Sequence, residues 1–161
     1  MKVVMGCLVW ILMESYAITA LCAQERLKKI EIYALNIATR YEQFLTIQAV
    51  LSHPRRFSDT VRDAEFLTAI EQRLVMLAER DTVTPIGGPH VVCFVHWSGS
   101  SLDTLLFGRQ QVWYNGNWRD QDPVLLWLLS VRFPQEYQQG VVEEIIVCER
   151  RRRLQKPNDD E

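Results

Sequence analysis

One stretch rich in proline and glycine, residues 82–89 (TVTPIGGP), divides this sequence into two parts of different character. Before it, residues 24–53 contain no proline or glycine, which favours helix. After it come short runs of β-branched and aromatic residues, which are typical of strands. The 161 residues suffice for one domain with a buried core. We therefore expect an α+β fold, with a helical hairpin over residues 24–80 before a small, mostly antiparallel sheet over residues 81–149.

Apolar residues spaced three and four apart predict the two helices of this hairpin. In the first helix, residues 24–51, the stripe consists of Leu27, Ile30, Ala34, Ile37, Tyr41, Phe44 and Leu51. Pro54 ends that helix near Ser52, and Ser58 is the expected N-cap of the second. The stripe of the second helix is Ala64, Leu67, Ile70, Leu74 and Leu77, ending near Arg80. The short loop predicts antiparallel packing of the two helices.

The β-rich part contains four apolar runs that predict strands. They are His90–Trp97, Leu102–Phe107, Gln110–Tyr114 and Val141–Cys148. Asn115-Gly116 lies between Gln110–Tyr114 and Asn117–Asp120, and Asn-Gly is the strongest short signal for a β-hairpin. We expect a tight turn there, with positive φ at both central residues.

A buried helix is predicted between the β-hairpin at Asn115-Gly116 and the last predicted strand, Val141–Cys148. Asp122 suits the N-cap and Pro123 the first helical position. Residues 123–133 are apolar nearly all round, so we expect this helix to be largely buried. Residues 150–161 follow as a charged tail that includes Arg150–Arg153. A solvated tail is the favoured interpretation, and contact with an acidic partner or a membrane surface is the alternative.

The N-terminal residues suggest where the protein is localised. Residues 3–13 are eleven uncharged residues behind Lys2, which suits the apolar core of a signal peptide better than a full membrane span. Cleavage after Ala23 would begin the mature chain at Gln24. An uncleaved anchor over residues 1–23 and a buried N-terminal strand and helix remain alternatives. A leader predicts a secreted, periplasmic or membrane-associated protein, with membrane contact through residues 3–23; without one the protein would be intracellular.

Charge and motif content exclude several function classes. The formal net charge is −2, whereas proteins that neutralise nucleic-acid phosphates usually carry a basic excess. We therefore expect no nucleic-acid partner. The sequence has no C-x-x-C motif and no cysteine–histidine spacing typical of zinc sites. Gly87-Gly88 lacks the lysine of a phosphate-binding loop, so neither a metal nor a cofactor is expected.

Cys93 and Cys148 would be the two cysteines left after removal of residues 1–23. In an oxidising compartment such a pair predicts a disulfide between neighbouring strands. The alternative is that each is a small buried apolar residue.

Aromatic residues cluster around the predicted hairpin. Trp97, Trp113, Trp118 and Trp127 fall within 31 residues, and Tyr114 lies among them. We name Trp113, Tyr114 and Trp118 as candidate binding residues, because exposed aromatic rings stack on ligands. The alternative is that they belong to the sheet core. Trp118, beside the hairpin tip, is the residue most expected to lie outside it.

A cysteine, a histidine and an asparagine occur in the chain order of papain-like enzymes. Cys22 precedes the first predicted helix, His96 ends a predicted strand, and Asn117 follows the hairpin turn. At these points the chain resembles the Josephin family of deubiquitinases. The matching segments are Leu21-Cys22-Ala23-Gln24, Leu27-Lys28-Lys29, His96-Trp97 and Tyr114-Asn115-Gly116-Asn117. The resemblance implies Cys22 as nucleophile, His96 as base and Asn117 as the residue that orients it, acting on ubiquitin-type isopeptide bonds.

A small exported or membrane-associated accessory protein is predicted from the leader, the helical hairpin and the aromatic sheet together. We expect it to act by binding another protein, without catalysis. The alternative is a Josephin-like cysteine peptidase that uses Cys22, His96 and Asn117.

Overall fold

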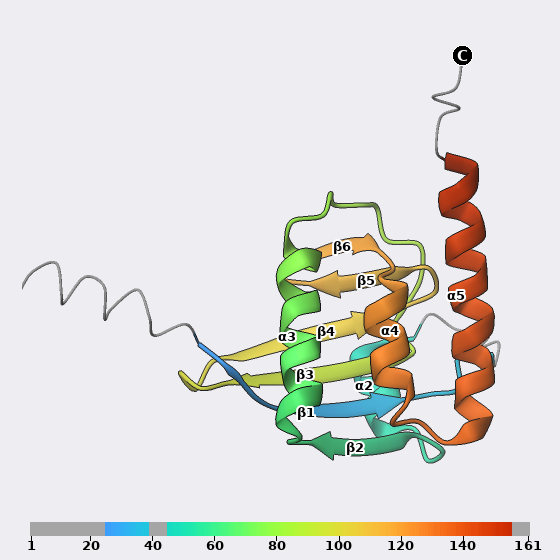
Figure 1. Cartoon of the computed structure of the whole chain (residues 1–161). Coiled ribbons are helices and arrows are strands. Elements are labelled where there is room, and N and C mark those ends of the chain that lie inside the picture. The colour runs from blue at the N-terminus through green and yellow to red at the C-terminus, as the bar shows by residue number, and fades with distance from the viewer. Residues whose placement is uncertain (1–24, 39–44, 156–161) are drawn as a thin grey trace, which may run out of the picture.

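The computed structural model of the chain describes residues 25–38 and 45–155. Six strands form one antiparallel sheet with the order β2-β1-β3-β4-β5-β6 (Figure 1). The strands are β1 (Leu27–Ala34), β2 (Phe57–Val61), β3 (Val91–Trp97), β4 (Leu102–Phe107), β5 (Gln111–Tyr114) and β6 (Asn117–Asp120). From β3 to β6 the strands follow chain order, so each pairs with its neighbour in sequence.

The helices of the described residues cover both faces of the sheet unequally. They are α2 (Ile47–Ser52), α3 (Ala64–Ala78), α4 (Pro123–Ser130) and α5 (Gln135–Gln155). In Figure 1, α3 and α4 cross the near face, α2 lies behind β1 and β3, and α5 stands beside α4 at one end of the sheet. The α+β class predicted from the sequence is thus confirmed.

Two apolar clusters follow from this arrangement. The larger lies between the sheet and the helices α3, α4 and α5, and includes Ile30, Ile32, Phe107, Leu125 and Val141. The smaller lies on the opposite face, where buried residues of β3, β4 and α2 meet. Strand side chains alternate between the two clusters because successive residues of a strand point to opposite faces.

The hairpin of β5 and β6 is confirmed. Trp113 pairs with Trp118, and Tyr114 pairs with Asn117. The two turn residues have positive φ, 49° at Asn115 and 80° at Gly116. This is the conformation that Asn-Gly favours, and it matches the twist of the flanking strands.

Two helices also appear close to where sequence predicted them, each with a side-chain cap. The carboxylate of Asp63 accepts the backbone N–H of Phe66 at 2.8 Å and begins α3. Asp122 accepts the backbone N–H of Leu125 at 2.9 Å, and Pro123 is the first residue of α4. Both caps satisfy amide groups that have no partner within the helix.

The predicted N-terminal helical hairpin is wrong. Residues 27–34 form β1, α2 begins only at Ile47, and β2 takes Ser58, the expected N-cap. The apolar residues of the segment LKKIEIYA fit both the spacing of a helix and the alternation of a strand. The strand alternation places Ile30, Ile32 and Ala34 in the core. A register shift between Leu27 and Lys29 hides this alternation at the start of the strand.

The predicted strand Val141–Cys148 is also wrong, because these residues lie within α5. Gly140, immediately before this segment, lies inside the helix as well. An added Cβ at Gly140 would lie 2.8 Å from the backbone nitrogen of Ala38, so glycine permits a close approach between α5 and the chain after β1. The helix continues through Arg150–Arg153, so the first part of the predicted charged tail is helical.

No helix of the described residues is both long enough and apolar enough to cross a membrane. The predicted leader, residues 1–23, and the final residues 156–161 of the predicted tail lie outside the described residues.

Candidate functional site

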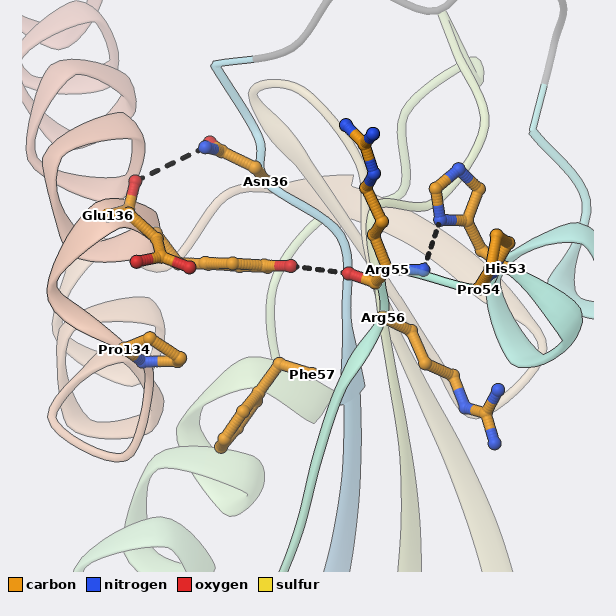
Figure 2. A pocket seen from close by; sticks show the side chains of 9 residues that line it. Asn36, His53, Pro54, Arg55, Arg56, Phe57, Pro134 and Glu136 are labelled. Carbon is orange, nitrogen blue, oxygen red and sulfur yellow. Dashed lines mark hydrogen bonds between the residues drawn. The ribbon is translucent and has the colours of Figure 1, made fainter.

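A pocket lies where the turn after α2 meets the first turn of α5 (Figure 2). Its volume is about 810 Å³. Its apolar and aromatic lining residues are Pro54, Phe57, Pro134 and Tyr137. Its polar lining residues are Asn36, His53, Arg55, Arg56 and Glu136.

Hydrogen bonds fix the backbone around this pocket. The hydroxyl of Tyr137 donates to the carbonyl oxygen of Arg55 at 2.6 Å, which ties α5 to the turn before β2. The backbone N–H of Arg55 donates to Nδ1 of His53 at 3.2 Å. Nδ2 of Asn36 donates to the carbonyl oxygen of Glu136 at 3.2 Å. Three segments distant in sequence are therefore held in one geometry.

The two arginines of the turn are exposed. Within residues 25–38 and 45–155, no carboxylate lies within ion-pair distance of either guanidinium group, and neither group donates a hydrogen bond. In Figure 2 the side chain of Arg55 extends toward the side of the pocket where Asn36 and His53 lie, and Arg56 extends away from them. The rim of the pocket thus carries uncompensated positive charge.

A second surface feature lies on α4, which was expected to be largely buried. Leu125, Leu126 and Leu129 are buried. The opposite stripe is exposed: 49% at Val124, 51% at Trp127 and 53% at Val131, the residue after the helix. Their spacing of three and four places them on one side of the helix. We call these three residues the α4 stripe.

An ionic cluster anchors the start of α4. The carboxylate of Asp122 is fully buried, and Oδ2 accepts from Arg73 at 2.5 Å and from Arg80 at 2.7 Å. Arg152 of α5 donates to the carbonyl oxygen of Gln121 at 2.8 Å. These bonds fix the orientation of α4 against α3 and α5, and so hold the α4 stripe in place. They also place Arg152 beside Gln121, just before α4.

The three predicted aromatic binding residues do not form one platform. Trp113 and Trp118 are neighbours on the face opposite α3 and α4, where both pack against the smaller apolar cluster. Tyr114 points to the other face and is only 4% exposed. Its hydroxyl lies 3.4 Å from Oδ2 of Asp103, and burial, followed by that carboxylate, raises its pKa to about 12. Tyr114 is therefore a core residue.

The predicted disulfide is absent, because Cys93 and Cys148 are both free thiols. Cys93 lies on β3 and Cys148 on α5, so they are not on neighbouring strands. Both are buried, and burial raises the pKa of Cys148 to about 12 and raises that of Cys93 as well. Thiols in such surroundings are poor nucleophiles.

The structure does not bring His96 and Asn117 together. His96 lies on β3 and Asn117 on β6, with two strands between them. The strand register also places them on opposite faces of the sheet. Nε2 of His96 lies 3.2 Å from Glu31, and Asn117 donates to the carbonyl oxygen of Asn115 within its own turn. Cys22 lies outside the described residues.

No group of three or more potential metal ligands among histidine, cysteine, aspartate and glutamate gathers within the described part of the chain. Comparison with protein-family models, with curated proteins and with solved structures finds no match to this chain.

Sequence reasoning missed both surface features. It predicted α4 but not the exposed stripe, because the sequence of a uniformly apolar helix does not show which side remains in contact with solvent. The only signal was composition: residues 123–131 are too uniformly apolar to define a single buried face. The pocket was missed because Asn36, Arg55 and Tyr137 lie on three segments far apart in sequence.

Proposed function

We propose that this is a small, non-catalytic accessory protein, exported or membrane-associated, that binds another protein through the α4 stripe. The observation that carries the proposal is the half-exposed Trp127 between Val124 and Val131 on a rigidly held helix. Tryptophan is enriched among the residues that dominate binding energy at protein interfaces. Burying the exposed half of this side chain supplies roughly 2 kcal/mol.

The charges around the α4 stripe support a particular partner. Residues 123–131 contain no charged side chain, so the stripe itself fits an apolar surface. Arg152 contacts the carbonyl of Gln121, and the exposed Arg150 and Arg151 precede it in α5. The complementary partner is a protein that presents an amphipathic helix, with an apolar stripe and carboxylates at one end.

Two further observations support a binding function. His96 and Asn117 face opposite sides of the sheet, which leaves the histidine without the asparagine that a papain-like site needs. The export or membrane association rests on the uncharged run of residues 3–13 in the sequence.

Site-specific photocrosslinking tests the proposal. The full-length protein, produced in its own cells, carries a photoreactive phenylalanine at position 127. A matched protein carries it at position 86, where Ile86 is an exposed apolar residue of the loop before β3. We expect one protein to crosslink at position 127 and not at position 86. The purified partner should then bind the unmodified protein directly.

Three results would overturn the proposal. Equal crosslinking at positions 127 and 86 would show that the stripe is not a specific surface. Crosslinks only to a second copy of the chain would assign the stripe to self-association. Crosslinks only to lipid would assign it to a membrane surface.

A further inference from the structure

We propose that the pocket between the turn at residues 53–57 and the first turn of α5 binds a ligand with one carboxylate on an apolar body. This site is independent of the α4 stripe and of the partner proposed for it. Its three parts are a positive rim, an aromatic wall and a backbone fixed by hydrogen bonds.

The charge of the rim matches a single anionic group. Arg55 and Arg56 contribute two positive charges and Glu136 contributes one negative charge, so the three ionised side chains sum to +1. Arg55 is the residue that we expect to contact the carboxylate, because its side chain extends toward the same side as Asn36 and His53 (Figure 2). A guanidinium group pairs with a carboxylate through two parallel hydrogen bonds. Arg56 extends away and adds to the field at longer range.

The inner part of the pocket suits an apolar body. Phe57 is half-buried and packs edge-on against Phe133, with ring centroids 5.7 Å apart. It also lies 6.4 Å from the ring of Tyr137. Together with Pro54 and Pro134, these rings form a wall without charge. The volume of about 810 Å³ falls in the range of about 300–1,000 Å³ typical of small-ligand pockets.

Hydrogen bonds fix the backbone of this pocket, so its shape is formed before a ligand binds. The Tyr137 hydroxyl holds the carbonyl of Arg55, and the backbone N–H of Arg56 donates to the carbonyl oxygen of His53 at 3.1 Å. The guanidinium of Arg55 therefore projects from an ordered turn, and no side chain of the described residues has to release it before it binds. Preorganisation of this kind lowers the entropic cost of binding.

Calorimetric and NMR titrations of the full-length protein test this inference. The first probe is phenylacetate, and phenylacetamide is its uncharged match. The second is a short peptide ending in phenylalanine with a free carboxylate, and the same peptide amidated is its match. We expect saturable binding of both carboxylates, with a dissociation constant on the order of 1 mM or lower. Tighter binding of the peptide would identify a protein C-terminus as the source of the carboxylate, and equal affinity a small molecule.

Three variants locate the binding. Arg55→Gln should weaken it at least fivefold, and Arg56→Gln about twofold, because only Arg55 contacts the ligand. Arg62→Gln is the control, since Arg62 is also an exposed arginine but lies beyond the far end of β2. The inference is overturned if the amides bind as tightly as the carboxylates. It is equally overturned by the same loss in Arg55→Gln and Arg62→Gln, or by no saturable binding below about 10 mM.

Discussion

Asn115 and Gly116 show how directly residue type can determine backbone conformation. Both have positive φ, and the strand pairing on either side follows from their turn. Asparagine tolerates this region through local hydrogen bonding, and glycine tolerates it because it has no Cβ. The register of β5 and β6 was therefore predictable from two residues.

Replacing Gly116 by valine should lower the free energy of unfolding by more than about 1 kcal/mol, because a β-branched residue resists positive φ. Gly87→Val is the matched control, since Gly87 has no positive φ and no neighbour within 4 Å of an added Cβ. Urea unfolding of both variants measures the difference. Equal stability of the two would show that the turn conformation does not constrain residue 116.

His90 couples stability to pH. It lies just before β3 and is buried, and burial, followed by the charge of Arg109, lowers its pKa to about 4. The folded protein therefore keeps His90 neutral over a range in which the unfolded chain binds a proton. Because the unfolded state binds more protons, stability should fall as pH decreases from about 6.5 to about 4.

The expected loss from His90 alone is at most about 3 kcal/mol over that range. Urea unfolding at pH 7 and at pH 4.5 measures it, and His90→Gln removes it. Burial raises the pKa of Glu144, which acts in the opposite direction but equally in both proteins. The wild type should thus lose more stability on acidification than His90→Gln. A loss of the same size in both would assign the pH dependence to other groups.

At the scale of elements, the strands β3 to β6 and the helices α3 and α4 were predictable, whereas β1, β2 and α5 were not. The strands at residues 91–97, 102–107 and 111–114 have β-branched and aromatic residues bounded by turn signals, so propensity and pattern agree. Residues 27–34 contain an apolar spacing that fits a helix as well as a strand. Pairing within the sheet stabilises the strand. Pairing with both β2 and β3 makes β1 a central strand, and such long-range pairing is not visible in a local pattern.

Gly140 lies inside α5, where a tertiary contact leaves no room for a Cβ. Replacing a helical glycine by alanine normally stabilises a helix by about 1 kcal/mol. At this position the new Cβ would lie 2.8 Å from the Ala38 nitrogen and 3.1 Å from its Cβ. Overpacking of this kind costs about 1–3 kcal/mol. We therefore expect Gly140→Ala to lower the free energy of unfolding by about 1 kcal/mol.

Gln139→Ala provides the control for Gly140→Ala, because Gln139 is exposed in the same turn of α5. Thermal and urea unfolding should show little change in that variant. A gain of stability in Gly140→Ala would mean that helix propensity outweighs the contact, and that α5 can move away from the chain after β1.

At the scale of the whole molecule, within residues 25–38 and 45–155, one face of the sheet packs against α3, α4 and α5 and the other against the short α2. The sequence predicted the class of fold and placed three candidate binding residues on this sheet, of which Tyr114 is core and Trp113 and Trp118 are partly buried. The exposed features lie instead on the outer side of α4 and at the junction of the turn at residues 53–57 with α5. Both depend on which surfaces remain uncovered after packing, and no local pattern contains that information.

The affinity of Trp127→Ala for the partner found by crosslinking shows whether Trp127 anchors that partner. Because about half of the Trp127 side chain is buried, the substitution should lower the free energy of unfolding by about 2 kcal/mol. The affinity should fall at least tenfold, as expected for a tryptophan at the centre of an interface. Leu102→Ala, an exposed apolar position on β4, should leave the affinity unchanged. An unchanged affinity of Trp127→Ala would show that Trp127 serves the fold and not a partner.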